Sequence, residues 1–504
     1  MVPPAKTLLR ATVHAVGLSC LYLVTGGVVS PGVAAARPPN IVVIETDDQS
    51  MHSFRRDVMP QTFRTIVDQG GTKFRNGIAA PPLCCPSRAG FLTGQYPHNH
   101  GVFDNEPGYA DLRRPRNTLP IWLRDAGYQT AFVGKYLNGT KEALGADPAP
   151  GWDKWYAIQG RPAYYHPDIN VNGQVRDLRD RYVTTVLNDY AQRTIERFAR
   201  DDRPFFLWLA HLAPHASRGT IAGCDETTPK PLKQDRRTFR NYPFERRPSF
   251  NEADVSDKPQ PIRNLDELPR REIRRIKLRY RCTLGALQEV DRGVKGIWHT
   301  LGDERLRRNT IVAFTSDNGY FFGEHRINMG KGRAYEEALN IPYVINTTRR
   351  VLGGPAVSRV DEVAANIDLA PTLLDAASAA PCHRGRCTIM DGRSLNGLLA
   401  GSGGSYPADR GVLIEVGDAS CRFAAIRAPR KTFSVNLRRS ASTGLCESSE
   451  RELYDLDEDP FELENIASTS PRVPELEARL ESLRRCSGIA GRDPAPKPPG
   501  SYCE

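Results

Sequence analysis

Short apolar runs alternate with amphipathic stretches from residue 40 onward. Residues 40–44, 205–209 and 310–314 are apolar at almost every position, and residues 130–133 form a weaker run. Continuous apolar runs of this length are typical of strands buried on both faces of a parallel sheet. Apolar residues three or four positions apart precede the runs at 205 and 310, which predicts helices there. We therefore expect an α/β fold with a large, mainly parallel sheet flanked by helices.

Changes in composition predict a surface insertion and a second, smaller unit. Residues 217–275 are rich in Pro, Arg and Lys with little periodicity, which predicts a long surface insertion. Further changes near 353–355 and 401–404 indicate linkers, so we expect a main domain at 37–380 and a C-terminal subdomain at 381–504. The subdomain contains segments that suit a small antiparallel sheet and then a helix: 412–416, 423–427, 432–436 and 452–455, followed by Leu476, Leu480 and Leu483.

The first 36 residues have the pattern of an export signal. Lys6 and Arg10 precede an apolar stretch over 15–29, and the small residues 34–36 end the segment. A single membrane anchor is the alternative, but the stretch is shorter than the roughly 20 residues that a spanning helix needs. We expect no stable membrane span and a mature chain that begins near Arg37. It would be secreted or periplasmic, or lysosomal in a eukaryotic cell.

Composition and charge narrow the class of protein and of partner. An apolar fraction of 39% in 504 residues is too high for a disordered chain. The net charge of +10 suits an anionic partner, although a solvated basic surface would have the same charge. We find no zinc-finger spacing, basic heptad helix or aromatic RNA-binding signature, so we expect no nucleic acid partner. A sulfated or phosphorylated extracellular substrate fits the predicted compartment better.

Polar residues follow each of the predicted buried strands. Asp47 and Asp48 follow the first strand, Lys135 the weaker one, His215 the one at 205–209, and Asp317-Asn318 the last. Ligands of an open parallel sheet bind beyond the carboxyl ends of its strands, so these groups are expected to converge. The oxygen-bearing side chains favour calcium or magnesium over zinc. Each motif alone could equally be a helix cap or a tight turn.

Adjacent cysteines begin the segment Cys84-Cys85-Pro86-Ser87-Arg88. Pro86 near a helix start places Cys84 just before a helix N-terminus, where free N–H groups favour an anion or a thiolate. The segment therefore suggests a reactive cysteine, and a structural disulfide is the alternative.

Cys-x-Pro-Ser-Arg followed by Leu-Thr-Gly resembles the signature of the formylglycine-dependent (type I) sulfatases. The resemblance runs from Pro39 through Tyr343 and includes TDD, CCPSR, GKY, APH, SDNG and GKG in the family's order. It implies an alkaline-phosphatase-like fold and a sulfuric ester hydrolase. It also implies that a separate formylglycine-generating enzyme oxidises Cys84 to formylglycine.

The resemblance also implies roles for individual residues. Formylglycine hydrate at position 84 would be the nucleophile and would pass through a covalent sulfo-enzyme intermediate. Preorganised cations and a general acid would stabilise the charge on the leaving oxygen. The family implies that Asp47, Asp48, Asp317, Asn318 and residue 84 bind one Ca²⁺, and that Arg88, Lys135, His215 and Lys331 hold the formylglycine and the sulfate.

One departure from the common pattern bears on the substrate. Many sulfatases have a histidine two residues after the lysine matched by Lys135, but this chain has Leu137, so the assisting base is unidentified. The same GKYLN variant is similar to the N-acetylglucosamine-6-sulfatase subgroup, which implies an amino-sugar sulfate in a glycosaminoglycan-like chain. His325 is expected to contact substrate; a histidine hydrogen-bonded in its loop is the alternative.

Three other functions compete with this interpretation. One is an arylsulfatase of broad specificity acting on aryl sulfates, and another is a phosphonate or phosphate-ester hydrolase. The third is a sulfated-glycan-binding protein in which Cys84 is never converted.

The cysteines suggest a disulfide framework. Of the eleven, Cys20 lies in the predicted signal and Cys84 would be modified, which leaves nine. Proximity along the chain suggests four pairs and a buried free thiol at Cys85: Cys224 with Cys282, Cys382 with Cys387, Cys421 with Cys446, and Cys486 with Cys503.

Overall fold

The computed structural model describes residues 1, 37–160, 163–403, 406–417, 422–440, 442, 446–496 and 500–504. The predicted export signal lies outside the described residues, apart from Met1. Residues 37–504 form one compact unit, and the predicted division at residue 380 stays a prediction. None of the described helices is long and apolar enough to cross a membrane.

The main sheet has ten strands in the order β10-β2-β9-β8-β1-β7-β3-β4-β5-β6. The four strands predicted from apolar runs are neighbours in its centre, in the order β8-β1-β7-β3, and all pair in parallel. The sheet is mixed, because β9, β5 and the edge strand β6 pair antiparallel with their neighbours. This confirms the predicted large, mainly parallel sheet. Its strands are β1 (Asn40–Thr46), β2 (Gly71–Ile78), β3 (Gln129–Gly134), β4 (Lys154–Ile158), β5 (Asp168–Val171), β6 (Gln174–Asp177), β7 (Phe205–Ala210), β8 (Thr310–Ser316), β9 (Tyr343–Asn346) and β10 (Arg359–Ala365).

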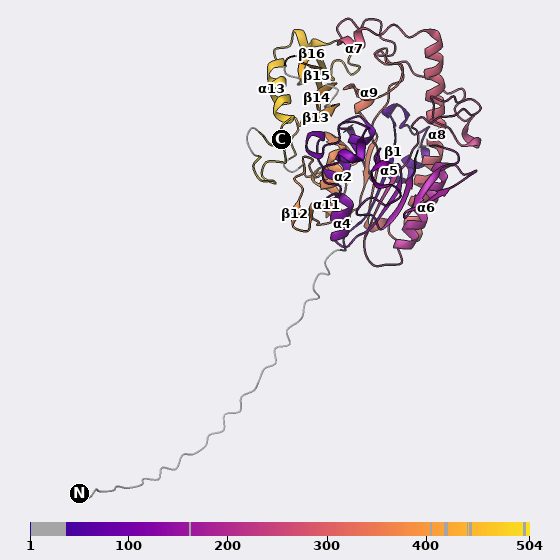
Figure 1. The fold of residues 1–504 in the computed structure, drawn as a ribbon, viewed down its shortest axis with the longest axis vertical. Helices are drawn as coiled ribbons and strands as arrows, with labels where there is room; N and C mark the ends of the chain where they lie inside the picture. The colour runs from indigo at the N-terminus through magenta and orange to yellow at the C-terminus, as the bar shows by residue number, and fades with distance from the viewer. Residues whose placement is uncertain are drawn as a thin grey trace. The chain divides into compact units, whose positions relative to one another are not determined.

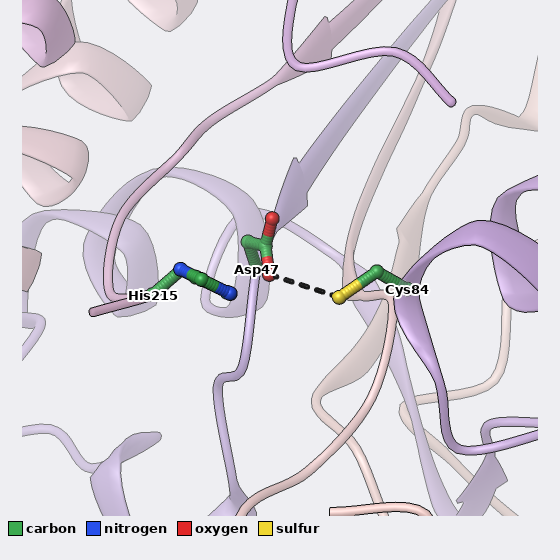
Figure 2. A group of neighbouring side chains, drawn as sticks. All are labelled: Asp47, Cys84 and His215. Atoms are coloured by element: carbon green, nitrogen blue, oxygen red, sulfur yellow. Dashed lines mark hydrogen bonds between the residues drawn. The ribbon is translucent and has the colours of Figure 1, made fainter. Parts of the chain in front are cut away.

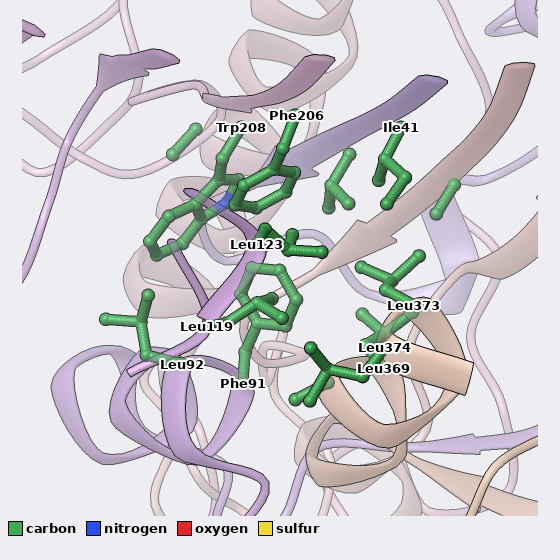
Figure 3. Packing of buried hydrophobic residues seen from close by; sticks show 14 of the residues in the cluster. Ile41, Phe91, Leu92, Leu119, Leu123, Phe206, Trp208, Leu369, Leu373 and Leu374 are labelled. Carbon is green, nitrogen blue, oxygen red and sulfur yellow. The ribbon is translucent and has the colours of Figure 1, made fainter. Parts of the chain in front are cut away.

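Helices cover both faces of this sheet (Figure 1). On one face, α2 (Cys84–Thr93), α4 (Leu119–Asp125) and α11 (Leu369–Ala376) pack against Ile41 and Val43 of β1. Figure 3 shows part of this layer, with Phe91 and Leu373 facing the strands. On the other face, α6 (Val183–Phe198) and α8 (Arg270–Asp303) pack against Val42 and Ile44. Successive residues of a strand point to opposite faces, so a run that is apolar throughout serves both layers.

The C-terminal sheet is antiparallel, as predicted. Its strands pair in sequence order, and α13 (Val473–Leu483) follows with Leu476, Leu480 and Leu483 buried. The apolar cluster that contains these three leucines also includes Ile78 and Val363 of the main sheet, so the two sheets share an interior. The strands are β13 (Val412–Val416), β14 (Phe423–Ala428), β15 (Lys431–Arg439) and β16 (Cys446–Asp455).

Short elements and disulfides complete the fold. The predicted insertion at 217–275 includes α7 (Gln260–Arg263). Its last residues are not a loop, because α8 already begins at Arg270; the charged first turns of α8 masked the helical periodicity in the sequence. The pairs Cys224–Cys282, Cys382–Cys387 and Cys486–Cys503 are confirmed, and Cys85 is a buried free thiol. Cys421, and with it the fourth predicted pair, lies outside the described residues. The remaining short elements are α1 (Pro60–Thr62), α3 (Pro97–His100), α5 (Thr140–Leu144), α9 (Glu336–Leu339), α10 (Arg349–Leu352), α12 (Asn396–Leu399), β11 (Cys382–His383) and β12 (Arg386–Cys387).

Candidate active site

Side chains from separate strands meet beyond the carboxyl ends of β8, β1, β7 and β3. Asp47 follows β1, His215 lies in the loop after β7, and Cys84 is the first residue of α2; Figure 2 shows the three side chains facing one another. The Cys84 thiol donates to Asp47 Oδ1 at 3.5 Å. The convergence expected of a parallel sheet is therefore present.

Cys84 is held at the N-terminus of α2. Leu83 before it is extended, and the helix ends at Gly94, which adopts a φ of 67° that favours glycine. The Cys84 side chain is buried, and Lys331 Nζ lies 2.7 Å from its sulfur. Burial, with the nearby Asp47 carboxylate, raises the pKa of the Cys84 thiol. The unmodified side chain is therefore a neutral thiol, which is a weak nucleophile.

Arg88 lies one helical turn after Cys84 and on the same side of α2. Its Nε donates to Asp317 Oδ2 at 2.9 Å, Nη2 to Asp47 Oδ2 at 3.4 Å, and Nη1 to the carbonyl of Lys135. The guanidinium is fully buried. It therefore links the ends of β1, β3 and β8 through charge-assisted hydrogen bonds.

The acidic groups fit a hard divalent cation. Potential ligand atoms of Asp47, Asp48, Cys84 and Asp317 lie within 4.8 Å of one another. Asn318 Nδ2 donates to Asp48 Oδ1 at 2.7 Å, while its buried Oδ1 has no hydrogen-bond partner among the described residues. Asp48 has a φ of 68°, an uncommon conformation for a residue other than glycine. Carboxylate and amide oxygens are the ligands that Ca²⁺ and Mg²⁺ prefer.

Two lysines and a histidine lie beside these carboxylates. Lys135 contacts Asp47, Lys331 contacts Asp48, and His215 Nε2 lies 3.8 Å from Asp48 Oδ2. Burial opposes ionisation of Asp47, but Lys135 and His215 hold its pKa well below the ordinary value. Burial lowers the pKa of His215. The His215 side chain is 31% exposed, against 13% for Lys331 and 10% for Lys135, so His215 is the most accessible of the three.

Glu45 is a buried member of the site that the sequence analysis did not identify. Its Oε2 accepts from Trp208 Nε1 at 3.2 Å and lies 3.6 Å from Arg88 Nη1. Burial raises the pKa of Glu45 to about 8, although Arg88 opposes this shift. A carboxylate at the end of a buried apolar strand is the signal that could have revealed it.

Two residues singled out from the sequence lie in other surroundings. His325 is fully buried, and its Nδ1 lies 2.7 Å from Glu252 Oε2. The partner Glu252 lies in another segment, 73 residues earlier in the chain, and the expected contact of His325 with substrate stays a prediction. Leu137 packs in the apolar cluster beside Tyr136, so position 137 contributes apolar contacts rather than a proton-transferring group.

Comparisons with known proteins identify the family. The sulfatase family profile matches residues 39–379, and a profile described as N-sulphoglucosamine sulphohydrolase, C-terminal, matches residues 323–485. Human N-acetylglucosamine-6-sulfatase is 31% identical over 95% of this chain and 91% of its own length. A putative extracellular sulfatase Sulf-1 homologue from Caenorhabditis elegans is 31% identical over 72% of this chain, which spans 49% of that protein's length. The extracellular sulfatase SULF-1 homologue from Drosophila melanogaster is 32% identical over 73% of this chain, which spans 32% of its length.

Solved structures show the same fold. A structure described as a complex with its substrate D-glucosamine-2-N,6-O-disulfate superposes with a TM-score of 0.71 at 22% identity, and it covers 88% of this chain and 97% of its own. The sheet order, the C-terminal antiparallel sheet and the matched profiles agree with one another. The chain therefore belongs to the type I sulfatase family of sulfuric ester hydrolases and is related to N-acetylglucosamine-6-sulfatase.

Proposed function

We propose that this protein is an exported sulfatase that removes 6-sulfate esters from N-acetylglucosamine in glycosaminoglycan-like substrates, using a formylglycine made from Cys84. The observation that carries the proposal is the position of Cys84 at the N-terminus of α2, with Asp47 and Lys331 beside its sulfur. The amino-sugar substrate is supported by the similarity to human N-acetylglucosamine-6-sulfatase, which covers 95% of this chain. Export is supported by the predicted signal.

The residues divide into two functional groups in this proposal. Asp47, Asp48, Asp317 and Asn318 would hold Ca²⁺ together with residue 84, and the ion would act as a Lewis acid toward the sulfate. The aldehyde at position 84 would supply, as its hydrate, the hydroxyl that attacks sulfur and displaces the alcohol. The second hydroxyl of the hydrate would lose its proton and expel sulfate, which restores the aldehyde.

The cationic residues would bind the sulfate and stabilise the transition state. Arg88 is fully buried and contacts three carboxylates, so we assign it to positioning residue 84 and the acidic groups. Lys331 and Lys135 would stabilise negative charge on the sulfate oxygens as the S–O bond breaks. His215 is partly exposed and would protonate the leaving alcohol.

The first test is mass spectrometry of the tryptic peptide 76–88 from protein secreted by its native host, with aldehyde trapping by a hydrazine reagent. We expect an aldehyde at Cys84 and an unmodified Cys85. Cys84→Ser should abolish sulfatase activity, while the adjacent control Cys85→Ser should retain it. Unmodified Cys84 in every molecule would favour a sulfated-glycan-binding protein instead.

Substrate and metal need separate assays. Parallel assays should rank N-acetylglucosamine 6-sulfate above aryl sulfate, phosphodiester and phosphonate esters; a preference for phosphorus esters would contradict the proposal. Dialysis against a calcium chelator should remove activity, and added Ca²⁺ should restore it. Asp317→Asn should require more Ca²⁺ for half-maximal activity, because it removes one charged oxygen ligand.

A further inference from the structure

A second group of buried ligand-type side chains lies outside the residues assigned to sulfate hydrolysis. It consists of His325 in the loop after β8, Glu337 in α9 and Glu462 in the segment after β16. One ligand atom from each lies within 4.8 Å of the other two. The three residues are at most 7% exposed. Glu462 is more than 120 residues from the other two in the sequence, so tertiary folding brings it to them.

Each side chain directs an unpaired atom into this group. His325 Nε2, Glu337 Oε2 and Glu462 Oε1 are buried and have no hydrogen-bond partner among the described residues. His325 Nε2 lies 3.7 Å from Glu337 Oε2, which is too long for a hydrogen bond. Two atoms that each lie about 2.0–2.2 Å from one metal ion can be separated by such a distance.

The other polar atoms of these side chains are held by neighbouring groups. Ser249 Oγ donates to Glu337 Oε1 at 3.2 Å, and the backbone N–H of Glu336 donates to Glu462 Oε2 at 2.8 Å. The outer contacts therefore fix both carboxylates and leave one oxygen of each directed inward.

The histidine has the surroundings of a metal ligand. His325 Nδ1 lies 2.7 Å from Glu252 Oε2, and the ring stacks on Tyr335 with centroids 4.3 Å apart. Metal-binding histidines commonly donate one ring N–H to a carboxylate, which leaves the other nitrogen as the ligand. Lys258 Nζ lies 3.2 Å from Glu252 Oε1 and balances that outer carboxylate. Two inner carboxylates and a neutral imidazole carry a charge of −2, which one divalent cation balances.

We propose that His325, Glu337 and Glu462 bind a second divalent cation of the zinc class, distinct from the Asp47 site. An imidazole nitrogen in the ligand set favours zinc, whereas the oxygen-rich Asp47 group favours calcium. The ion would join the C-terminal segment after β16 to the loop between β8 and α9, which carries Lys331. Its role would therefore be structural, holding the loop that delivers Lys331 to the active site.

Protons are the competing way to satisfy the same atoms. Burial opposes a charged imidazole, but Glu252 and Glu337 raise the pKa of His325 to about 10. Burial, with Glu336 and Glu337 nearby, raises the pKa of Glu462 well above its ordinary value. An imidazolium and a protonated Glu462 would then replace the metal, so the experiment must measure the ion itself.

The test is zinc content by inductively coupled plasma mass spectrometry after incubation with Zn²⁺ and exhaustive dialysis. Glu462→Gln should lose one equivalent of zinc per chain relative to wild type. Glu458→Gln is the matched control, because Glu458 is exposed in the same segment. Cys84→Ser is a second control, because Asp47, Cys84 and His215 form another group that could take zinc; it should keep the equivalent that Glu462→Gln loses.

X-ray absorption at the zinc edge of the wild-type protein gives a measurement that needs no variant to fold. We expect nitrogen and oxygen ligands for the retained ion and no sulfur. Three results would overturn the proposal: no zinc retained by wild type, equal zinc in wild type and Glu462→Gln, or a spectrum showing only a sulfur-ligated ion. None of these depends on sulfatase activity, so the proposed function is judged separately.

Discussion

Replacing Arg88 by methionine is expected to destabilise the protein strongly. The guanidinium donates to Asp317 at 2.9 Å and to Asp47 at 3.4 Å, and the three side chains have no solvent exposure. Removing one partner of a buried ion pair leaves an uncompensated charge and costs about 3–5 kcal/mol. Methionine occupies a similar length of the site, so we attribute the loss to charge and hydrogen bonding rather than to a cavity.

A second substitution tests that attribution. Burial and Asp47 raise the pKa of Asp317, whereas Arg88 opposes the shift. Asp317→Asn removes the carboxylate that Arg88→Met would leave unpaired, while Asp47 keeps its contact with Lys135. The double variant should therefore be less destabilised than the sum of the single variants, with a coupling of roughly 0.5–3 kcal/mol.

The assay is thermal and urea unfolding followed by circular dichroism, in a chelator so that metal binding does not mask the effect. Arg203→Met is the control, because Arg203 forms a salt bridge of 2.7 Å with Asp201 but its side chain is 59% exposed. Exposed ion pairs contribute little to stability, so the free energy of unfolding of this variant should be close to that of wild type. Equal unfolding of Arg88→Met and Arg203→Met, or strict additivity with Asp317→Asn, would refute the reasoning.

Two further predictions concern stability away from the active site. Burial disfavours the imidazolium of His98, but Glu415 at 2.7 Å raises its pKa from 6.5 to about 9. The stabilisation of the fold by the His98–Glu415 pair should be complete below pH 6.5 and lost as the pH rises through about 9. Melting temperatures of wild type and His98→Gln should therefore converge at high pH. A difference that stays constant with pH would contradict this. Replacing both cysteines of a disulfide by serine should lower the free energy of unfolding in guanidinium according to the length of the closed loop. We expect a loss of about 4 kcal/mol for Cys224–Cys282, with a sequence separation of 58, and about 2 kcal/mol for Cys382–Cys387, with a separation of 5. Equal losses would argue against the loop-entropy explanation.

Local patterns determined the elements of this protein and much of its candidate site. The apolar runs at 40–44 and 310–314 became β1 and β8, because strands buried on both faces need apolar residues at every position. Pro86 and the residues around it placed Cys84 at the start of α2. The polar residues after each strand, such as Asp47 and Asp317, could be expected to meet because parallel strands end at one edge.

Other features depended on contacts between distant segments, which no local pattern encodes. In the central order β8-β1-β7-β3, β1 pairs on both sides with residues more than 160 positions away, as in Ile41 with Phe206. Glu45 became a partner of Arg88 only because α2 packs over the end of β1. His325 and Glu337 came to lie near Glu462 because the segment after β16 packs against α9, where the backbone N–H of Glu336 donates to Glu462. Sequence periodicity records which face of an element is buried, whereas the identity of the buried polar partners is decided by tertiary packing.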